Sequence, residues 1–398
     1  MKRLVASAAA YSLLCCPIWA VYAPVPAEDQ GHPVIVETQA GLRYDSNIFG
    51  TNENEQESFV ALFAPTVKGQ ASLGQQTFLQ GTYGLELAQY FDRSGDDTLL
   101  NHQLGLKLDH TFDPRTFFKV ADNLRFIDDP EALIPTEIQR DQSYWSNDAT
   151  LDYQWGATPK LALGANLNRY DIRYEEAALG EVLDRGDTIV GGEARFALLP
   201  EAELVGAVHY GDVSYDTDDA LRGSETWRGL LGVDYVPGPK LNLGLRAGLE
   251  QRARNDGTDT DAFTGNVSLS YRYLPQSFFA LNLSHELRET TMPNLYPESE
   301  VDAVYLSGQH DLTGNNRLFL TSLLLYERST LQVRESYAGV LDDVDEHVLR
   351  GGLGLSWRYD ETWRVDLNYD LDLIESDEPL REQARHRVSL ALAYRFAP

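Results

Sequence analysis

Apolar and polar residues alternate over long segments of this chain. In the segment 363–373, every second residue is apolar, beginning with Trp363, and the residues between them are polar or charged. The segments 161–168, 241–250 and 279–288 repeat the pattern. A period of two predicts β-strands with one dry face and one wet face. Strands of about a dozen residues exceed the roughly 5–6 of an average soluble strand and suffice for the ~9–11 that cross a membrane.

Two kinds of connection separate the alternating segments. Short turns rich in Gly, Pro, Asn and Asp, such as 113–115 and 237–239, alternate with longer acidic loops. Eight turns and nine loops give 18 strands, and imperfect alternation in 35–47 and 318–327 sets the range at 16–18. We therefore predict an all-β fold, a transmembrane antiparallel up-and-down β-barrel with short periplasmic turns and longer extracellular loops. The alternatives are a soluble β-sandwich and a β-solenoid.

The first residues predict export from the cytoplasm. Met1-Lys2-Arg3 and a brief apolar run are typical of a signal peptide, here 1–23 with cleavage after Ala23 or, alternatively, after Ala20. A lipoprotein anchored through Cys15 or Cys16 is a weaker alternative, because the residues before them fit poorly. We expect a short periplasmic segment at 24–34 and the barrel at 35–398. Both cysteines fall in the leader, so the mature chain has neither a disulfide nor a thiolate metal site.

The overall composition narrows the function classes. The chain has 61 acidic and 33 basic residues and a formal charge of −28, which argues against nucleic acid as a partner. A mean hydropathy of −0.35 resembles that of a soluble protein, but a barrel hides its lipid-facing residues by alternation. No Gly-x-Ser-x-Gly elbow or His-Glu-x-x-His pair is present, so we expect no enzyme, no cofactor and no metal site.

The polar faces of the strands provide candidate functional residues. If the apolar face contacts lipid, the polar face lines a water-filled lumen, where opposed charges could hydrogen-bond a hydroxyl-rich solute. For each single residue, the alternative is a hydrated or ion-paired wall group with no role in transport. The lumen-lining candidates are Lys119, Arg125, Arg246, Glu250, Arg252, Glu286, Arg288, Arg358, Arg364, Asp366, Asp370 and Asp372.

The loops add two expectations. The acidic loops predict a preference for cations at low salt, because they concentrate cations at the channel mouth. Loop 128–142 contains Leu133 and Ile134 and is long enough to fold into the lumen as a constriction. His110 and His285 lie on alternating strands near a rim, where we expect them to join an interfacial belt.

The last segment of the chain alternates as far as Tyr394 and Phe396. A final strand that closes in an aromatic residue resembles the signal read by the barrel-assembly machinery of Gram-negative bacteria. Here Ala397 and Pro398 follow the aromatic residue, whereas the typical pattern ends on it. We therefore expect the assembly machinery and outer-membrane lipid as partners, and the outer membrane as the location.

The run Arg43-Tyr44-Asp45-Ser46-Asn47-Ile48-Phe49 opens the first predicted strand. It resembles the opening of the outer-membrane proteins called β-barrel porin 2, with Tyr44, Asp45, Ser46 and Asn47 as the shared motif. Length, turn spacing and the aromatic last strand agree with the resemblance. It implies a role in exopolysaccharide secretion, with a periplasmic polysaccharide export protein and the polysaccharide itself as partners.

The sequence thus predicts an outer-membrane β-barrel channel. The resemblance favours a conduit for exopolysaccharide or capsule export, and the alternative is a general or solute-specific porin. An outer-membrane enzyme or adhesin is a further alternative from another class. The pattern of residues leaves the transported molecule, the direction of transport and the oligomeric state open.

Overall fold

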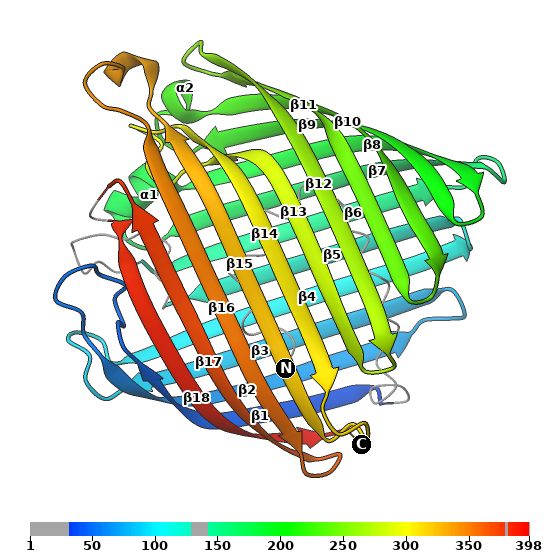
Figure 1. The fold of residues 1–398 in the computed structure, drawn as a ribbon, viewed down its shortest axis with the longest axis vertical. Coiled ribbons are helices and arrows are strands. Elements are labelled where there is room, and N and C mark those ends of the chain that lie inside the picture. Colours follow the sequence, from blue (N-terminus) through cyan, green and yellow to red (C-terminus); the bar gives the residue numbers. More distant parts are fainter. Residues whose placement is uncertain (1–31, 129–141, 379–380, 398) are drawn as a thin grey trace.

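A computed structural model of the chain describes residues 32–128, 142–378 and 381–397. They form one closed antiparallel barrel of 18 strands, in which each strand pairs with its neighbours in sequence and β1 pairs with β18 (Figure 1). This confirms the predicted fold class. The signal peptide 1–23, most of segment 24–34 and loop 128–142 apart from its ends lie outside the described residues.

The strands are β1 (Val34–Asp45), β2 (Ser58–Ser72), β3 (Thr77–Tyr90), β4 (Thr98–Asp113), β5 (Thr116–Ile127), β6 (Tyr144–Trp155), β7 (Leu161–Tyr174), β8 (Arg185–Leu199), β9 (Ala202–Tyr215), β10 (Ser224–Gly238), β11 (Leu241–Arg254), β12 (Asp259–Leu274), β13 (Ser277–Glu289), β14 (Glu298–Asp311), β15 (Leu318–Gln332), β16 (Val344–Arg358), β17 (Trp363–Ser376) and β18 (Gln383–Phe396). In the described part of the long loops lie three short helices: α1 (Ala177–Leu183), α2 (Asp219–Arg222) and the 3₁₀ helix η3 (Glu335–Tyr337). Among the described residues, no helix is long and apolar enough to cross a membrane.

The register sorts the alternating residues onto two faces of the wall. Leu367 on β17 lies opposite Leu390 on β18, which lies opposite Leu42 on β1, and all three are exposed on the outer face. Because side chains alternate in a strand, the polar residues between them point into the barrel. The strands form a barrel because each can turn its polar face to a water-filled lumen and its apolar face to lipid.

Aromatic side chains border the outward apolar band at both ends. Near the short turns, the rings of Trp363 and Tyr394 lie 4.8 Å apart, and Phe396 is exposed beside them. At the loop end, tyrosines pair with histidines, as in Tyr369 with His386 at 3.0 Å. Rings that combine an apolar body with a polar tip suit the two membrane interfaces.

His110 and His285, which the sequence predicts to join an interfacial belt, both have aromatic neighbours. His110 lies 4.3 Å from the ring of Phe112, and His285 lies 5.9 Å from the ring of Phe263. His110 is near a short turn and His285 near the loop end, so they join opposite borders of the band.

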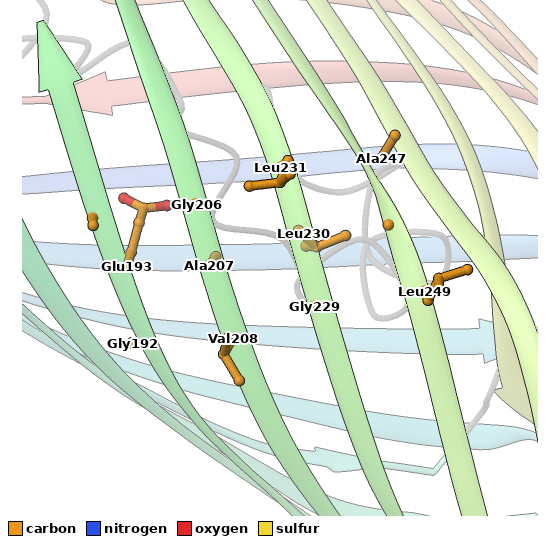
Figure 2. Close-up of a pocket in the computed structure, with 12 residues that line it drawn as sticks. Gly192, Glu193, Gly206, Ala207, Val208, Gly229, Leu230, Leu231, Ala247 and Leu249 are labelled. Atoms are coloured by element: carbon orange, nitrogen blue, oxygen red, sulfur yellow. The ribbon is translucent and has the colours of Figure 1, made fainter.

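Part of the outer face is built from small residues. Gly192, Gly206 and Ala247 on neighbouring strands contribute to a shallow recess of about 680 Å³, and the exposed side chains of Leu231 and Leu249 flank it (Figure 2). Leu231 is 75% exposed and Leu249 is 71% exposed. A soluble monomer rarely presents so continuous an apolar surface to water. The outer face therefore suits a lipid environment.

Candidate functional site: the channel lumen

The register places the twelve predicted lumen residues on the face opposite the exposed apolar residues. On β17, for example, Arg364, Asp366 and Asp370 alternate with the outward Leu367 and Tyr369. On β5, Lys119 lies opposite Asp109 of β4 and Asp152 of β6, which share its face. The structure therefore brings these residues together as one inner wall.

One set of ion pairs lies at the long-loop end of the inner wall near the closing seam. Arg385 on β18 donates to both carboxylate oxygens of Asp45 on β1, at 3.0 and 2.6 Å. Arg387 donates to Asp372 on β17 at 2.7 Å. Asp45 is 0% exposed, so its charge is stabilised by the guanidinium of Arg385 and not by water.

A second set lies on the inner face of β10 and β11 at the same end. Buried Glu250 accepts hydrogen bonds from Arg228 at 2.6 Å and from Arg252 at 3.1 Å. On β13, Arg288 donates to Glu286 at 2.9 Å and to Glu327 of β15 at 2.6 Å. We call these two sets of ion pairs the charged collar. It consists of Arg385 with Asp45, Arg387 with Asp372, Arg228 and Arg252 with Glu250, and Arg288 with Glu286 and Glu327.

The end of the lumen near the short turns is also paired. Asp234 accepts from Arg195 at 2.6 Å and from Arg246 at 2.8 Å, and these residues line a cavity of about 790 Å³. Arg364 bonds Asp366 on its own strand and Glu37 on β1, which lies beyond β18. Two further predicted cations lie over rings, with Lys119 4.7 Å from the ring centre of Phe117 and Arg358 5.6 Å from that of Phe319.

Between these charged zones, the inner wall is mainly neutral. On β17, Asn368 separates the pair Arg364 and Asp366 from Asp370 and Asp372. Amides occupy comparable middle positions on four more strands, and several bond across strands, as Asn266 does to Asn282 at 2.9 Å. This amide belt consists of Asn123, Asn166, Asn168, Asn266, Asn282 and Asn368.

The motif on β1 closes the barrel. Tyr44 points outward and donates to Glu57 at 2.5 Å, whereas Asp45 points inward to Arg385. Ser46 bonds the backbone of β18 through its hydroxyl and its amide, and the Asn47 side chain donates to the carbonyl of residue 384 at 3.1 Å. Asp45, Ser46 and Asn47 therefore join the first strand to the last strand at the end of the long loops.

The pairing of β12 with β13 stops early. It ends at Gly265 opposite His285, whereas β13 continues to pair with β14 as far as Glu289 opposite Glu298. Beyond His285, the alternation would point Leu287 and Glu289 to the outside. Instead, Leu287 is only 3% exposed, and Glu289 accepts hydrogen bonds from Arg252 at 3.1 Å and Arg254 at 3.3 Å.

Because Arg252 and Arg254 lie on the inner face of β11, residues 287–298 lie inside the wall. We call this segment the hairpin tip. Glu298 contacts Arg254 at 3.1 Å, and Arg252 donates to the Leu287 carbonyl at 3.2 Å in place of the missing backbone ladder. The tip therefore narrows the long-loop end of the lumen.

Arginines from three other loops anchor the hairpin tip. Arg222 bonds Asn294 at 2.8 Å, Arg334 bonds the Pro293 carbonyl at 2.7 Å, and Arg381 bonds Thr291 at 3.0 Å. Arg334 is itself paired with Asp256. Burial alone would raise the pKa of Asp256, but hydrogen bonds from Thr258 and the charge of Arg334 lower it overall, so the carboxylate stays ionised.

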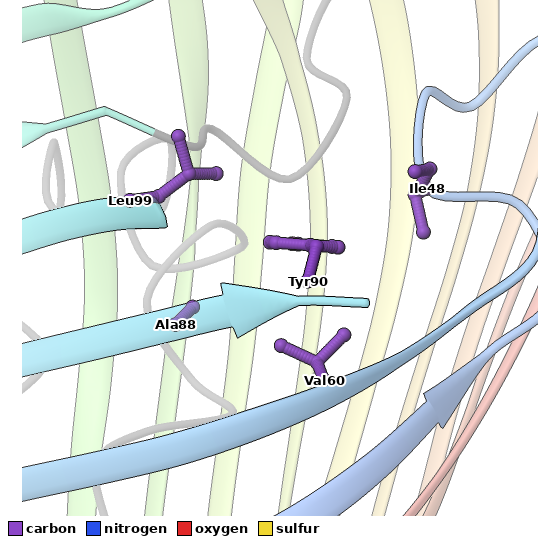
Figure 3. Packing of buried hydrophobic residues seen from close by; sticks show 5 residues of the cluster. All are labelled: Ile48, Val60, Ala88, Tyr90 and Leu99. Carbon is purple, nitrogen blue, oxygen red and sulfur yellow. The ribbon is translucent and has the colours of Figure 1, made fainter. Parts of the chain in front are cut away.

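A small apolar cluster covers another part of the inner wall. Ile48, from the loop after β1, packs onto Val60, Ala88, Tyr90 and Leu99 of β2 to β4 (Figure 3). Val60, Ala88 and Tyr90 are almost fully buried although they point inward, because this loop folds over them. The loop and the hairpin tip approach the mouth from different parts of the barrel.

The sequence predicts which residues line the inner wall, but it predicts neither their ion-pair partners nor the constriction by the hairpin tip. Arg385 and Arg387 were visible in the alternation of the last strand, yet only the closed barrel brings them to Asp45 and Asp372. His209, on the inner face of β9, carries no local signal. Neither does the hairpin tip, whose inward bend depends on arginines far away in sequence. The predicted constriction at 128–142 lies almost entirely outside the described residues.

No protein-family model and no curated protein matches the chain. Solved structures do match at low identity. A BenF-like porin from Pseudomonas fluorescens Pf-5 is 11% identical, with a TM-score of 0.48 over 91% of this chain and 99% of that one. The outer membrane protein opdK from Pseudomonas aeruginosa is 13% identical, with a TM-score of 0.48 over 91% and 98%. OccK2 (OpdF) from the same organism is 13% identical, with a TM-score of 0.49 over 92% and 98%.

Proposed function

We propose that the protein is a channel of the Gram-negative outer membrane through which small polar solutes diffuse. The observation that carries this proposal is the two-faced closed wall, apolar and bordered by aromatic rings outside, polar and ion-paired inside. A closed barrel satisfies its backbone hydrogen bonds within the wall and so tolerates lipid. Eighteen strands leave room inside for water and small solutes.

The expected role in exopolysaccharide export has no support from the fold or the comparisons. The hairpin tip favours the other interpretation, a general or solute-specific porin. It occupies the extracellular end of the lumen, and arginines of three loops hold it there. A polymer strand would have to displace these buried contacts.

Two measurements test the channel function. The mature protein, purified in detergent and inserted into a planar bilayer, is expected to give stepwise ion conductance. Liposomes that contain it are expected to swell when diluted into an isosmotic solution of a small neutral solute. A refolded barrel that inserts into bilayers but gives neither conductance nor swelling would overturn the proposal.

A further inference from the structure

We propose that His209 and the part of the amide belt on β7 to β13, namely Asn166, Asn266 and Asn282, form a binding site for neutral polyhydroxylated solutes, such as monosaccharides and polyols. The inference rests on the proposed channel function and adds a substrate class to it. It starts from a contrast within the lumen, because the charged groups near both ends are engaged with one another. The neutral groups between them keep capacity both to donate and to accept, whereas the N–H groups left over on paired arginines such as Arg252 and Arg288 can only donate.

Three neutral groups in this part of the wall are buried yet not satisfied by the described residues. His209 and Asn282 are each 6% exposed, and Nδ1 of His209 and Nδ2 of Asn282 make no hydrogen bond there. The Ser284 hydroxyl, next along β13, is in the same situation. Buried polar groups normally have partners, so these are available to a ligand in the lumen.

The chemistry of these groups selects the ligand. An amide offers two N–H donors and a carbonyl acceptor, and a neutral imidazole offers one of each. A sugar hydroxyl both donates and accepts, so adjacent hydroxyls can satisfy both kinds of group at once. An anion or a cation would find only one kind of complementary group here. A neutral polyol fits the belt better than either ion.

The backbone provides space for the site. Gly191 on β8 lies between Asn166 on β7 and His209 on β9, and a Cβ there would lie 2.1 Å from Asn166 Oδ1 and 2.3 Å from His209 Cδ2. Glycine therefore lets both side chains lie flat against the wall. His209 and Asn266 line the cavity of about 790 Å³ together with the ion-paired Asp234, Arg195 and Arg246, and its size is in the usual range for small-molecule sites.

The test compares two neutral solutes of similar size on the reconstituted wild-type channel. A monosaccharide carries donors and acceptors, whereas a short ethylene glycol oligomer carries mainly ether acceptors. We expect the monosaccharide to reduce the ion current in a saturable manner. The oligomer is expected to reduce it only in proportion to its concentration, without saturation. Equal, non-saturating effects of both solutes would overturn the binding site while the ion current still supports the channel.

Variants locate the site. His209→Leu and Asn282→Leu each remove a hydrogen-bonding group, and loss of one such bond is expected to weaken the monosaccharide block about fivefold. Gly191→Val should abolish saturation, because it pushes His209 and Asn166 into the lumen. Gly192→Val is the matched control, since its added side chain meets nothing within 4 Å on the outer face. Unchanged block in the first three variants would also overturn the proposal. Absence of any ion current in wild type would instead overturn the channel function.

Discussion

The charged collar and the amide belt line the same lumen but use their polar groups differently. In the collar, each buried charge that we describe has an opposite charge within reach, on its own strand, as Glu286 has Arg288, or on another strand, as Asp45 has Arg385. In the belt, groups such as the Asn282 amide nitrogen and the His209 imidazole keep unused capacity. A buried charge needs a fixed partner, whereas a neutral polar group tolerates one that comes and goes. The collar therefore maintains the shape of the wall, and the belt can interact with solute.

The largest effect is expected from breaking one collar pair. Asp45→Ala leaves Arg385 buried without its carboxylate at the closing seam, which is expected to cost roughly 3–5 kcal/mol of the free energy of unfolding. Urea unfolding of the refolded barrel in detergent, followed by tryptophan fluorescence, measures the change. Glu57→Gln is the control at a contact of the same motif, because Glu57 bonds Tyr44 on the exposed face. If both variants unfolded at the same urea concentration as wild type, the collar would not hold the seam.

The next effect concerns the hairpin tip. Glu289→Gln combined with Glu298→Gln removes both carboxylates that Arg252 and Arg254 hold. Removing one partner from a buried charge pair costs on the order of 2–5 kcal/mol, so the tip should leave the lumen and the single-channel conductance should rise. Glu300→Gln changes an exposed carboxylate beside the tip and should leave conductance unaltered. A conductance equal to wild type in the double variant would mean that the tip does not narrow the path.

The wall and the hairpin tip also differ in how far the sequence predicts them. The strands, their number and the inward position of residues such as Arg246 and Asp366 follow from a period of two, a local property. Pro65 interrupts the alternating pattern of the sequence, yet it lies within β2. There it is opposite Thr38 of β1 and has no ladder partner on β3. The tip could not be predicted, because Arg252, Arg334 and Arg381 hold it from other strands and loops. Long-range pairing of this kind leaves no periodic trace in the chain.

A smaller effect on conductance is expected from pH, because the ion pair between Arg334 and Asp256 helps to anchor the hairpin tip. The folded pKa of Asp256 lies below its ordinary value of 3.8, so the pair with Arg334 is fully formed above that value and is lost as pH falls through the lowered one. Conductance should therefore stay constant from neutral to mildly acidic pH and change only in stronger acid. Asp256→Asn should show its altered conductance already at neutral pH and no further acid transition. A wild-type transition near pH 6 would point to a group other than Asp256.

The smallest expected effect separates the loops from the inner wall. Inside, arginines such as Arg228, Arg387 and Arg364 balance nearby acids, whereas the chain as a whole carries a formal charge of −28 and its loops are acidic. The excess negative charge therefore acts at the mouth and not along the path. Because the Debye length falls from about 10 Å at 0.1 M salt to about 3 Å at 1 M, cation preference should be modest at low salt and absent at high salt. Reversal potentials across a tenfold KCl gradient measure it at both mean concentrations. A cation preference that persisted at high salt would mean that unbalanced acids lie within the lumen itself. Wall charges would then take part in selecting the solute, and the amide belt would not select it alone.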